Sequence, residues 1–366
     1  MGEENKLESK IFDILKILEK MSVSEMMRFD VRDYEFRRVV AEARLESKEK
    51  SDALAADFEE YENPSNNIVV KTAIGKKWAQ SGMLDFDYDA SLFANCIYWL
   101  TMFQDRSAIL GLLDEEKKKE NEYAITCNSI CYRGDTMNSW STTLNEFCRK
   151  CGEPYIAGWN GRDTLRDPRY NKYKEWYELL SVPQNYKQDL PEYITEFMDV
   201  VYTIGNFFPM PRALRGISGA HDYWDLALLA IYQHYKKTED EAYEPEYTEC
   251  TLEWVFGTKK EETCIKWLCS FNGWNHFVEQ NFLQDFVHLD EENGGYGRPK
   301  ELWNKHFECR GENATKKILP VENDEFSEFF TNASAWILAR GARIAPEVKE
   351  QLENKDLHEL ARRMAG

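Results

Sequence analysis

The sequence predicts a mainly α-helical protein, with one large helical domain, a few short strands and an N-terminal helical appendage. Two observations lead to this fold class. Apolar residues recur at spacings of three and four along most of the chain, which is the period of a helix that faces a core. Loops containing proline or glycine separate these segments. With 43% hydrophobic and 14% aromatic residues, a chain of 366 residues can also bury an extended core.

The first 62 residues are expected to form the N-terminal helical appendage. Apolar side chains at 7–21 have helical spacing, and residues 33–61 are rich in Ala, Glu, Lys and Arg. The Asn and Pro residues at 63–67 end the second helix, so the main domain is expected to span 63–366. Two helices are too few to bury a core alone. They either dock on the main domain, which is the favoured interpretation, or form an arm that joins a homo-oligomer.

The main domain is expected to be mostly helical. Residues 91–102 are almost all apolar, which favours a buried helix and leaves a strand as the alternative. Short, partly β-branched stretches predict strands at 68–70 and 123–130. The basic residues from Arg340 to the C-terminus predict a solvated helix. Further helices are expected at 170–180, 191–204, 222–235, 263–271, 274–286 and 323–340.

Charge and composition exclude some classes of function. The formal net charge of −19 argues against a protein that coats nucleic acid, because neutralising phosphates requires a surplus of lysine and arginine. The chain has no run of about 18 apolar residues, so no helix is expected to span a bilayer. Its charged first ten residues do not resemble a secretory signal. Nine cysteines, an odd number, fit a reducing environment, so the expected location is the cytoplasm.

The most informative segment is 202–235, which gathers polar residues before an apolar helix. Asp222 and Asp225 have the spacing of a capping box at a helix start. Residues 226–232 are apolar on all sides, so this helix and its N-terminus are expected to be buried. A buried helix start near Arg215 could bind an anionic group, with Asn206 close by. Capping and ligand binding both remain open as interpretations.

A second polar group occupies 132–139. Asp135 or Thr136 is a natural N-cap for a helix that ends near Gly152. Arg133, Asn138 and Ser139 are then surplus polar groups, expected on the first helical turn, that could hold a phosphate or a nucleotide.

Zinc binding by cysteines is a less favoured hypothesis. The intervening segment is expected to be helical, and cysteines spaced by three also serve as small apolar residues on a helix face. The four cysteines in question are Cys127, Cys131, Cys148 and Cys151.

Several of these polar blocks, in the same order, resemble a family of uncharacterised bacterial proteins defined only as a domain of unknown function. The resemblance covers about 132–307 and is most specific in the block 222–226. It implies a bacterial cytoplasmic protein and brings no established reaction. The polar positions that it shares with this chain are Arg215, Asp222, Asp225 and Asp285.

Together, these features favour an enzyme that acts on a phosphate-bearing substrate, either a nucleotide or RNA, in a toxin or phage-defence setting. The expected catalytic residues, acting as base or as ligands of a magnesium-like ion, are Asp222, Asp225 and Asp285. The expected substrate-binding residues are Arg133, Asn138, Ser139, Asn206 and Arg215. The alternative is a non-enzymatic interaction protein that binds a partner through an acidic, aromatic-rich surface.

Overall fold

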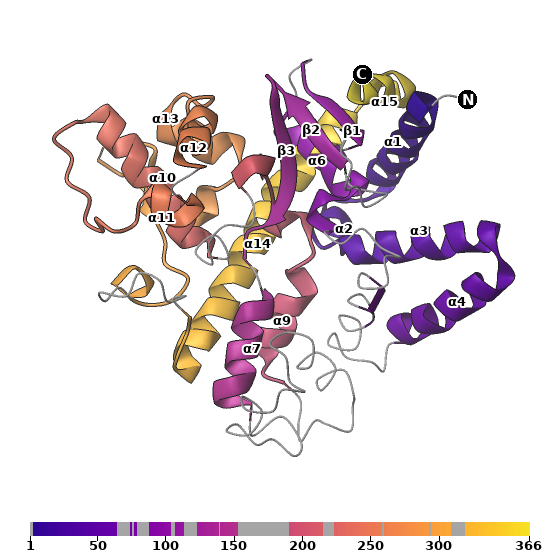
Figure 1. The fold of residues 1–366 in the computed structure, drawn as a ribbon, viewed down its shortest axis with the longest axis horizontal. Helices are drawn as coiled ribbons and strands as arrows, with labels where there is room; N and C mark the ends of the chain where they lie inside the picture. Colours follow the sequence, from indigo (N-terminus) through magenta and orange to yellow (C-terminus); the bar gives the residue numbers. More distant parts are fainter. Residues whose placement is uncertain are drawn as a thin grey trace.

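The computed structural model shows a mainly α-helical protein with a few short antiparallel strands, as the sequence predicts (Figure 1). The expected strand at 68–70 and the expected helix at 170–180 lie outside the residues that it describes, as do Ser139, Arg215 and Asp222. The described residues are 3–63, 74, 77–78, 88–103, 107–112, 123–138, 140–152, 190–214, 223–257, 260–292, 294–308 and 319–366.

Four helices form the N-terminal segment: α1 (Glu3–Lys20), α2 (Val23–Met27), α3 (Val31–Glu46) and α4 (Lys48–Glu62). The expectation of one continuous helix over 33–61 is wrong. Ser47 has extended backbone angles and its side chain accepts a hydrogen bond from the amide of Lys50, so it starts a new helix there. Helix α1 packs on α15 (Leu357–Ala365) and α2 packs on α14 (Asn323–Leu352). The division at residue 62 stays a prediction.

One four-stranded antiparallel sheet has the order β1 (Ile109–Leu112), β2 (Tyr123–Cys127), β3 (Ile130–Thr136) and β4 (Phe207–Pro211). The strand expected at 123–130 is confirmed over 123–127, but it ends earlier than expected, because the chain turns back at Asn128 and Ser129 and a second strand begins at Ile130. Both turn residues have positive φ angles, 49° and 65°, as a two-residue hairpin turn of type I′ requires. Helix α6 (Leu92–Thr101), expected from its apolar run, contacts β1, β2 and β3.

The expected N-cap at Asp135 or Thr136 is also wrong, because both residues belong to β3. They pair with Phe208 and Phe207 of β4, some seventy residues later in the chain. Helix α7 (Trp140–Cys151) begins only after this strand. Long-range pairing has overridden the local helix-start signal. A Cβ atom on Gly134 would lie 1.8 Å from the carbonyl oxygen of Asp89, so β3 needs a glycine where it passes η1 (Tyr88–Ala90).

The long helix α14 crosses the middle of the molecule and packs against α9 (Glu192–Val200) and η3 (Ile204–Asn206) (Figure 1). Arg340, expected in a solvated helix, is instead fully buried. Its guanidinium donates to the carbonyl oxygens of Gly205 (3.0 Å), Phe207 (2.7 Å) and Asn281 (3.0 Å). These carbonyl groups replace part of the water that a buried guanidinium loses, and Nη2 is buried without a hydrogen-bond partner among the described residues. Arg340 thereby ties α14 to two distant loops.

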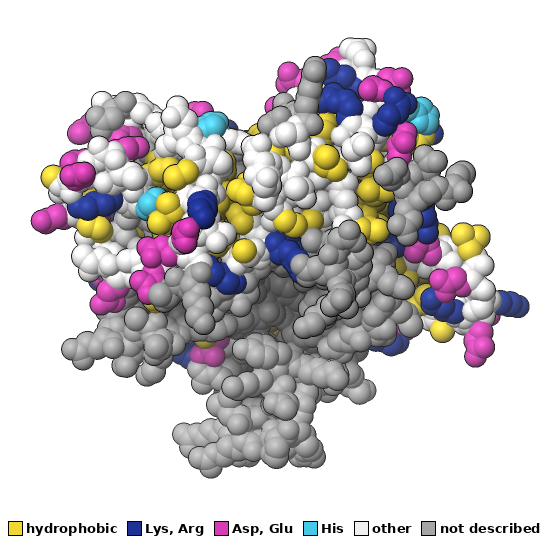
Figure 2. Space-filling view, turned by 45° about the horizontal axis from the view of Figure 1, so that its top comes forward, with side chains coloured by type: hydrophobic (Ala, Val, Ile, Leu, Met, Phe, Trp, Pro, Cys, Tyr) yellow, Lys and Arg dark blue, Asp and Glu magenta, His cyan; other side chains and the backbone are white. Residues whose placement is uncertain are grey.

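The remaining elements lie together on one side of the sheet (Figure 1). They are η4 (Arg212–Leu214), α10 (Trp224–Glu239), α11 (Leu252–Phe256), α12 (Glu261–Leu268), α13 (Gly273–Gln280), η7 (Gln284–Phe286), β5 (Val287–Leu289), β6 (Tyr296–Pro299) and η8 (His306–Glu308). Within the described part of the chain, every helix lacks the length or the apolar content needed to cross a membrane. Figure 2 shows acidic, basic and hydrophobic side chains interspersed over the described part of one face.

Candidate functional site

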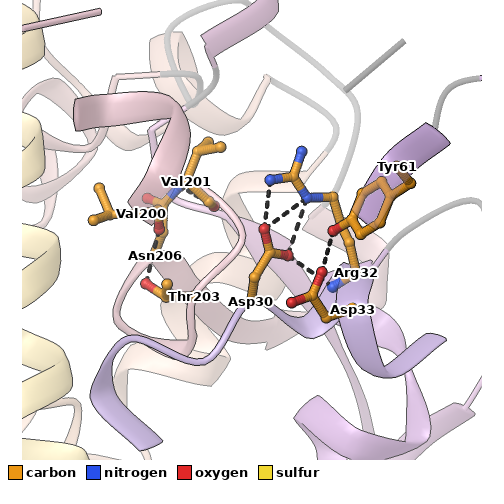
Figure 3. Close-up of polar contacts among 8 residues, drawn as sticks. All are labelled: Asp30, Arg32, Asp33, Tyr61, Val200, Val201, Thr203 and Asn206. Carbon is orange, nitrogen blue, oxygen red and sulfur yellow. Dashed lines mark hydrogen bonds and ion pairs between the residues drawn. The ribbon is translucent and has the colours of Figure 1, made fainter. Parts of the chain in front are cut away.

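Asn138, Asn206 and Asp225, three of the expected site residues, are all buried. Asn206 accepts a hydrogen bond from the amide of Asn138 (3.0 Å) and donates to the carbonyl oxygen of Asn138 (3.2 Å). It also donates to the carbonyl oxygen of Val201 (3.0 Å), and Figure 3 shows it among the residues of that loop. Its amide group thus fastens the loop before β4 to the residues after β3. This is a structural role, and binding of a substrate by Asn206 stays a prediction.

The same loop is held from its other side by the N-terminal segment. Figure 3 shows the Asp30 carboxylate against the Arg32 guanidinium, at 3.0 Å from its Nε. Arg32 is buried, and its guanidinium carbon lies 4.1 Å from the centre of the Tyr202 ring. The amide of Val31 donates to the carbonyl oxygen of Tyr202 (3.1 Å). A paired and stacked arginine therefore fixes the start of α3 to this loop.

Asp225 pairs with a histidine that the sequence did not single out. Helix α10 begins at Trp224 with Tyr223 as its N-cap, so the expected capping box between Asp222 and Asp225 is wrong. Asp225 Oδ2 lies 2.5 Å from His306 Nδ1 and accepts a hydrogen bond from the amide of Leu302 (2.9 Å). Because Nδ1 faces the carboxylate, it carries the proton of the neutral imidazole, and Nε2 is left as the acceptor.

His306 belongs to a buried polar cluster made of Asn138, Thr143, Tyr223, Asp225 and His306. Its ring stacks on Trp303 with centroids 3.5 Å apart and meets the edge of Tyr223 at 5.6 Å. The Tyr223 hydroxyl lies 3.0 Å from Thr143 Oγ1, and the Tyr223 backbone pairs with that of Asn138. Within this cluster, His306 Nε2 and Asn138 Oδ1 are buried without a hydrogen-bond partner among the described residues.

This cluster has the parts of a proton-accepting site. A carboxylate that orients a histidine, with the second ring nitrogen open, is the arrangement that activates nucleophiles in many enzymes. The side chains of Asp225 and His306 are both completely buried, however. A substrate would reach Nε2 only after a rearrangement, and the catalytic role of Asp225 stays a prediction.

The other expected residues are in different surroundings. Asp285 forms an ion pair of 2.5 Å with Arg343 at the surface, and so has a different partner from Asp225. Arg133 is not on a helical turn as expected, since it lies on β3 opposite Met210. Searched over the described residues alone, His, Cys, Asp and Glu side chains form no group of three that could hold a metal ion. Of the four cysteines, Cys127 and Cys131 lie on the hairpin and Cys151 ends α7.

Sequence reasoning missed a cleft beside the β2–β3 hairpin, which we call the hairpin cleft. Its volume is about 600 Å³, within the range of small-molecule sites. The aromatic side chains among its lining residues are Phe103, Tyr132, Trp267, Phe271 and His276. The remaining lining residues are Thr101, Met102, Cys127, Asn128, Pro209, Ser270, Glu279, Gln280 and Asn281.

Polar groups line this cleft beside its aromatic side chains. Tyr132 hydrogen-bonds Ser270, and burial raises the pKa of the Tyr132 hydroxyl to about 12, so it stays protonated near neutral pH. His276 Nδ1 accepts a hydrogen bond from the amide of Asn272 (2.8 Å), which leaves Nε2–H as a donor in the neutral ring. Glu279 is exposed, as is His276. Stacking surface surrounded by donors and acceptors is the usual composition of a ligand site.

A second hollow of about 560 Å³ also borders the hairpin turn, and we call it the basic hollow. Asn128 lines the hairpin cleft, and the next residue, Ser129, lines the basic hollow. The two charged residues that line the basic hollow are Arg212 and Lys260, and both are basic.

Compared with family models, curated protein sequences and solved structures, the chain matches none of them. Membership of the uncharacterised bacterial family stays a prediction.

Proposed function

We propose that the protein binds a small ligand with an aromatic base, a nucleoside or a nucleotide, in the hairpin cleft, as the binding step of an enzyme that acts on a phosphate-bearing substrate. The observation that carries this proposal is the cleft itself. Its volume of about 600 Å³ and its mixture of aromatic walls and polar groups fit one base with its sugar.

Aromatic side chains favour a flat ligand. Phe103 and Phe271 are the half-buried rings of the lining, and each packs against a buried ring, Tyr132 with centroids 4.7 Å apart and Trp267 with centroids 6.0 Å apart. Stacking a base on such rings contributes about 1–3 kcal/mol per base. The Ser270 hydroxyl already donates to the Trp267 carbonyl oxygen (2.6 Å), so the Nε2–H of His276 is the donor that can read the edge of the base or the sugar hydroxyls.

A single nucleotide suits this protein better than a polymer. With a net charge of −19, the chain repels an extended phosphate backbone, whereas a cleft of this size requires only local attraction. Among the described surface residues, the large exposed apolar side chains are on several separate elements, as in many monomers. That distribution does not favour the alternative of an interaction protein. The toxin or phage-defence setting stays a prediction.

Binding can be tested with the four common ribonucleosides and their 5′-monophosphates, followed by calorimetry and by ligand-observed NMR. We expect at least one base to bind, and Phe271→Ala to weaken it about tenfold through loss of one stacking ring. Phe12→Ala is the matched control, because Phe12 is also half-buried but stacks on His358 in the contact of α1 with α15. Absence of binding by all eight compounds, or an equal effect of both substitutions, would contradict the proposal.

A further inference from the structure

We propose that the basic hollow is the phosphate subsite of the ligand whose base occupies the hairpin cleft, so that the protein selects nucleotides over nucleosides. This inference rests on the proposed function. It adds a second set of residues and a specificity that the cleft alone does not provide. The residues that line the basic hollow are Ser129, Ile130, Cys131, Pro211, Arg212, Ala213, Lys260 and Thr263.

The chemistry of this lining suits a phosphate group. Arg212 and Lys260 supply positive charge, and the hydroxyl groups of Ser129 and Thr263 supply hydrogen-bond donors. Each lining residue that the structure describes is basic or uncharged. Glu262, on the same helix as Thr263, directs its carboxylate to Lys266 at 2.8 Å. Burial lowers the pKa of Lys260, as expected for an ammonium group partly removed from water.

The hollow and the cleft share two structural elements. Both border the hairpin turn, where Asn128 lines the cleft and Ser129 lines the hollow. Along α12, Thr263 lines the hollow, and Trp267, four residues later, lines the cleft. Residues at this spacing lie on the same face of a helix, about 6 Å apart along its axis. The linings of the two hollows are thus separated along α12 by about the length of one sugar.

The backbone that borders the two hollows has a restricted conformation. Asn128 and Ser129 both have positive φ angles, which are uncommon for residues with side chains. On the facing strand, Pro209 lines the cleft and Pro211 lines the hollow, so the two prolines fix the backbone on that side. A preorganised rim of this kind reduces the entropy that is lost when a ligand bridges both hollows.

The test compares a nucleoside, its 5′-monophosphate and inorganic pyrophosphate by calorimetry, on the full chain at fixed salt. For the base that binds, we expect the monophosphate to bind about tenfold or more tightly than the nucleoside. Arg212→Gln and Lys260→Gln should remove most of this difference and leave nucleoside affinity unchanged. Arg212→Lys should restore part of it, because the charge is kept. Lys266→Gln is the control, since Lys266 is exposed on α12 and pairs with Glu262.

The outcomes separate this inference from the proposed function. If nucleoside and monophosphate bind equally, or if the two substitutions change nothing, the phosphate subsite is wrong while base binding stands. If all nucleosides fail to bind but pyrophosphate binds wild-type protein and not Arg212→Gln, the subsite is supported and the base cleft is wrong. If pyrophosphate and monophosphates both fail to bind, the inference is overturned. Circular dichroism and the unfolding midpoint of each variant establish that it is folded.

Discussion

Two aspartates that the sequence assigns to the same role are expected to behave very differently when each is replaced by alanine. Asp225 is completely buried and paired with His306, whereas Asp285 is a surface residue paired with Arg343. Asp225→Ala should therefore destabilise the fold strongly, and Asp285→Ala only slightly. The comparison uses one chemical change at two sites, so the difference reports burial and hydrogen bonding.

The size of the effect follows from the contacts. Removing the Asp225 carboxylate leaves the His306 Nδ1–H and the amide of Leu302 without their acceptor in the interior. Each buried unsatisfied donor costs about 1–3 kcal/mol, and breaking a buried pair on one side typically costs about 3–5 kcal/mol. An exposed ion pair such as that of Asp285 contributes about 1 kcal/mol or less. We expect Asp225→Ala to lose at least 2 kcal/mol more stability than Asp285→Ala.

Urea unfolding followed by tryptophan fluorescence measures this difference, since the chain has 11 tryptophans. Asp225→Asn is a milder third variant, because it keeps the volume and one acceptor oxygen. Equal unfolding midpoints for the two alanine variants would show that the pairing of Asp225 with His306 is not what stabilises this region. A stable Asp225→Ala protein that also keeps every measured activity would exclude the catalytic role expected for this residue.

Two further predictions concern packing and pH. Gly205→Ala should destabilise the protein by several kcal/mol, because the new Cβ would lie 2.0 Å from the Ile337 carbonyl oxygen. Gly111→Ala should be nearly neutral, because no described atom beyond its chain neighbours lies within 4 Å of the new Cβ. Equal thermal unfolding midpoints for the two variants would refute this prediction. Burial raises the pKa of Glu35, which pairs with Arg38 at 2.8 Å, so its folded form binds the proton more tightly than its unfolded form. The stability that comes from protonating Glu35 is therefore fully present below its unfolded pKa and is lost as the pH rises through its folded pKa. The neutral variant Glu35→Gln does not undergo this loss, so it should become more stable relative to wild type between pH 4 and pH 7. Urea titrations of both proteins at the two pH values measure this change.

The residues at the hairpin illustrate why local patterns were insufficient. Asn128 and Ser129 favour a turn, but the β-branched residues around them predict a single strand. The local sequence does not show that the residues before the turn pair with those after it. Asp135 and Thr136 had a genuine helix-start pattern, which pairing with β4 overrode. Such pairings depend on packing between distant segments, which local propensity does not encode.

The candidate sites show the same limit. Asp225 stood out because a carboxylate precedes a fully apolar helix, and the structure does place it in the interior. Its partner His306 lies 81 residues later and carries no local signal. The lining of the hairpin cleft likewise comes from distant parts of the chain, with Tyr132 on the hairpin and Trp267 on α12. A search for polar residues that lie close together in the sequence therefore could not find the cleft.

The sequence by itself determined the helical class of this protein, most of its helices and the burial of Asp225, because helical periodicity and apolar content act over a few residues. Only the tertiary structure decided the strand pairing, the burial of Arg340 and the two hollows beside the hairpin. These features depend on which distant segments pack together, and that choice is made by the whole core. A local pattern records the preference of each segment, whereas a binding site is made where several segments meet.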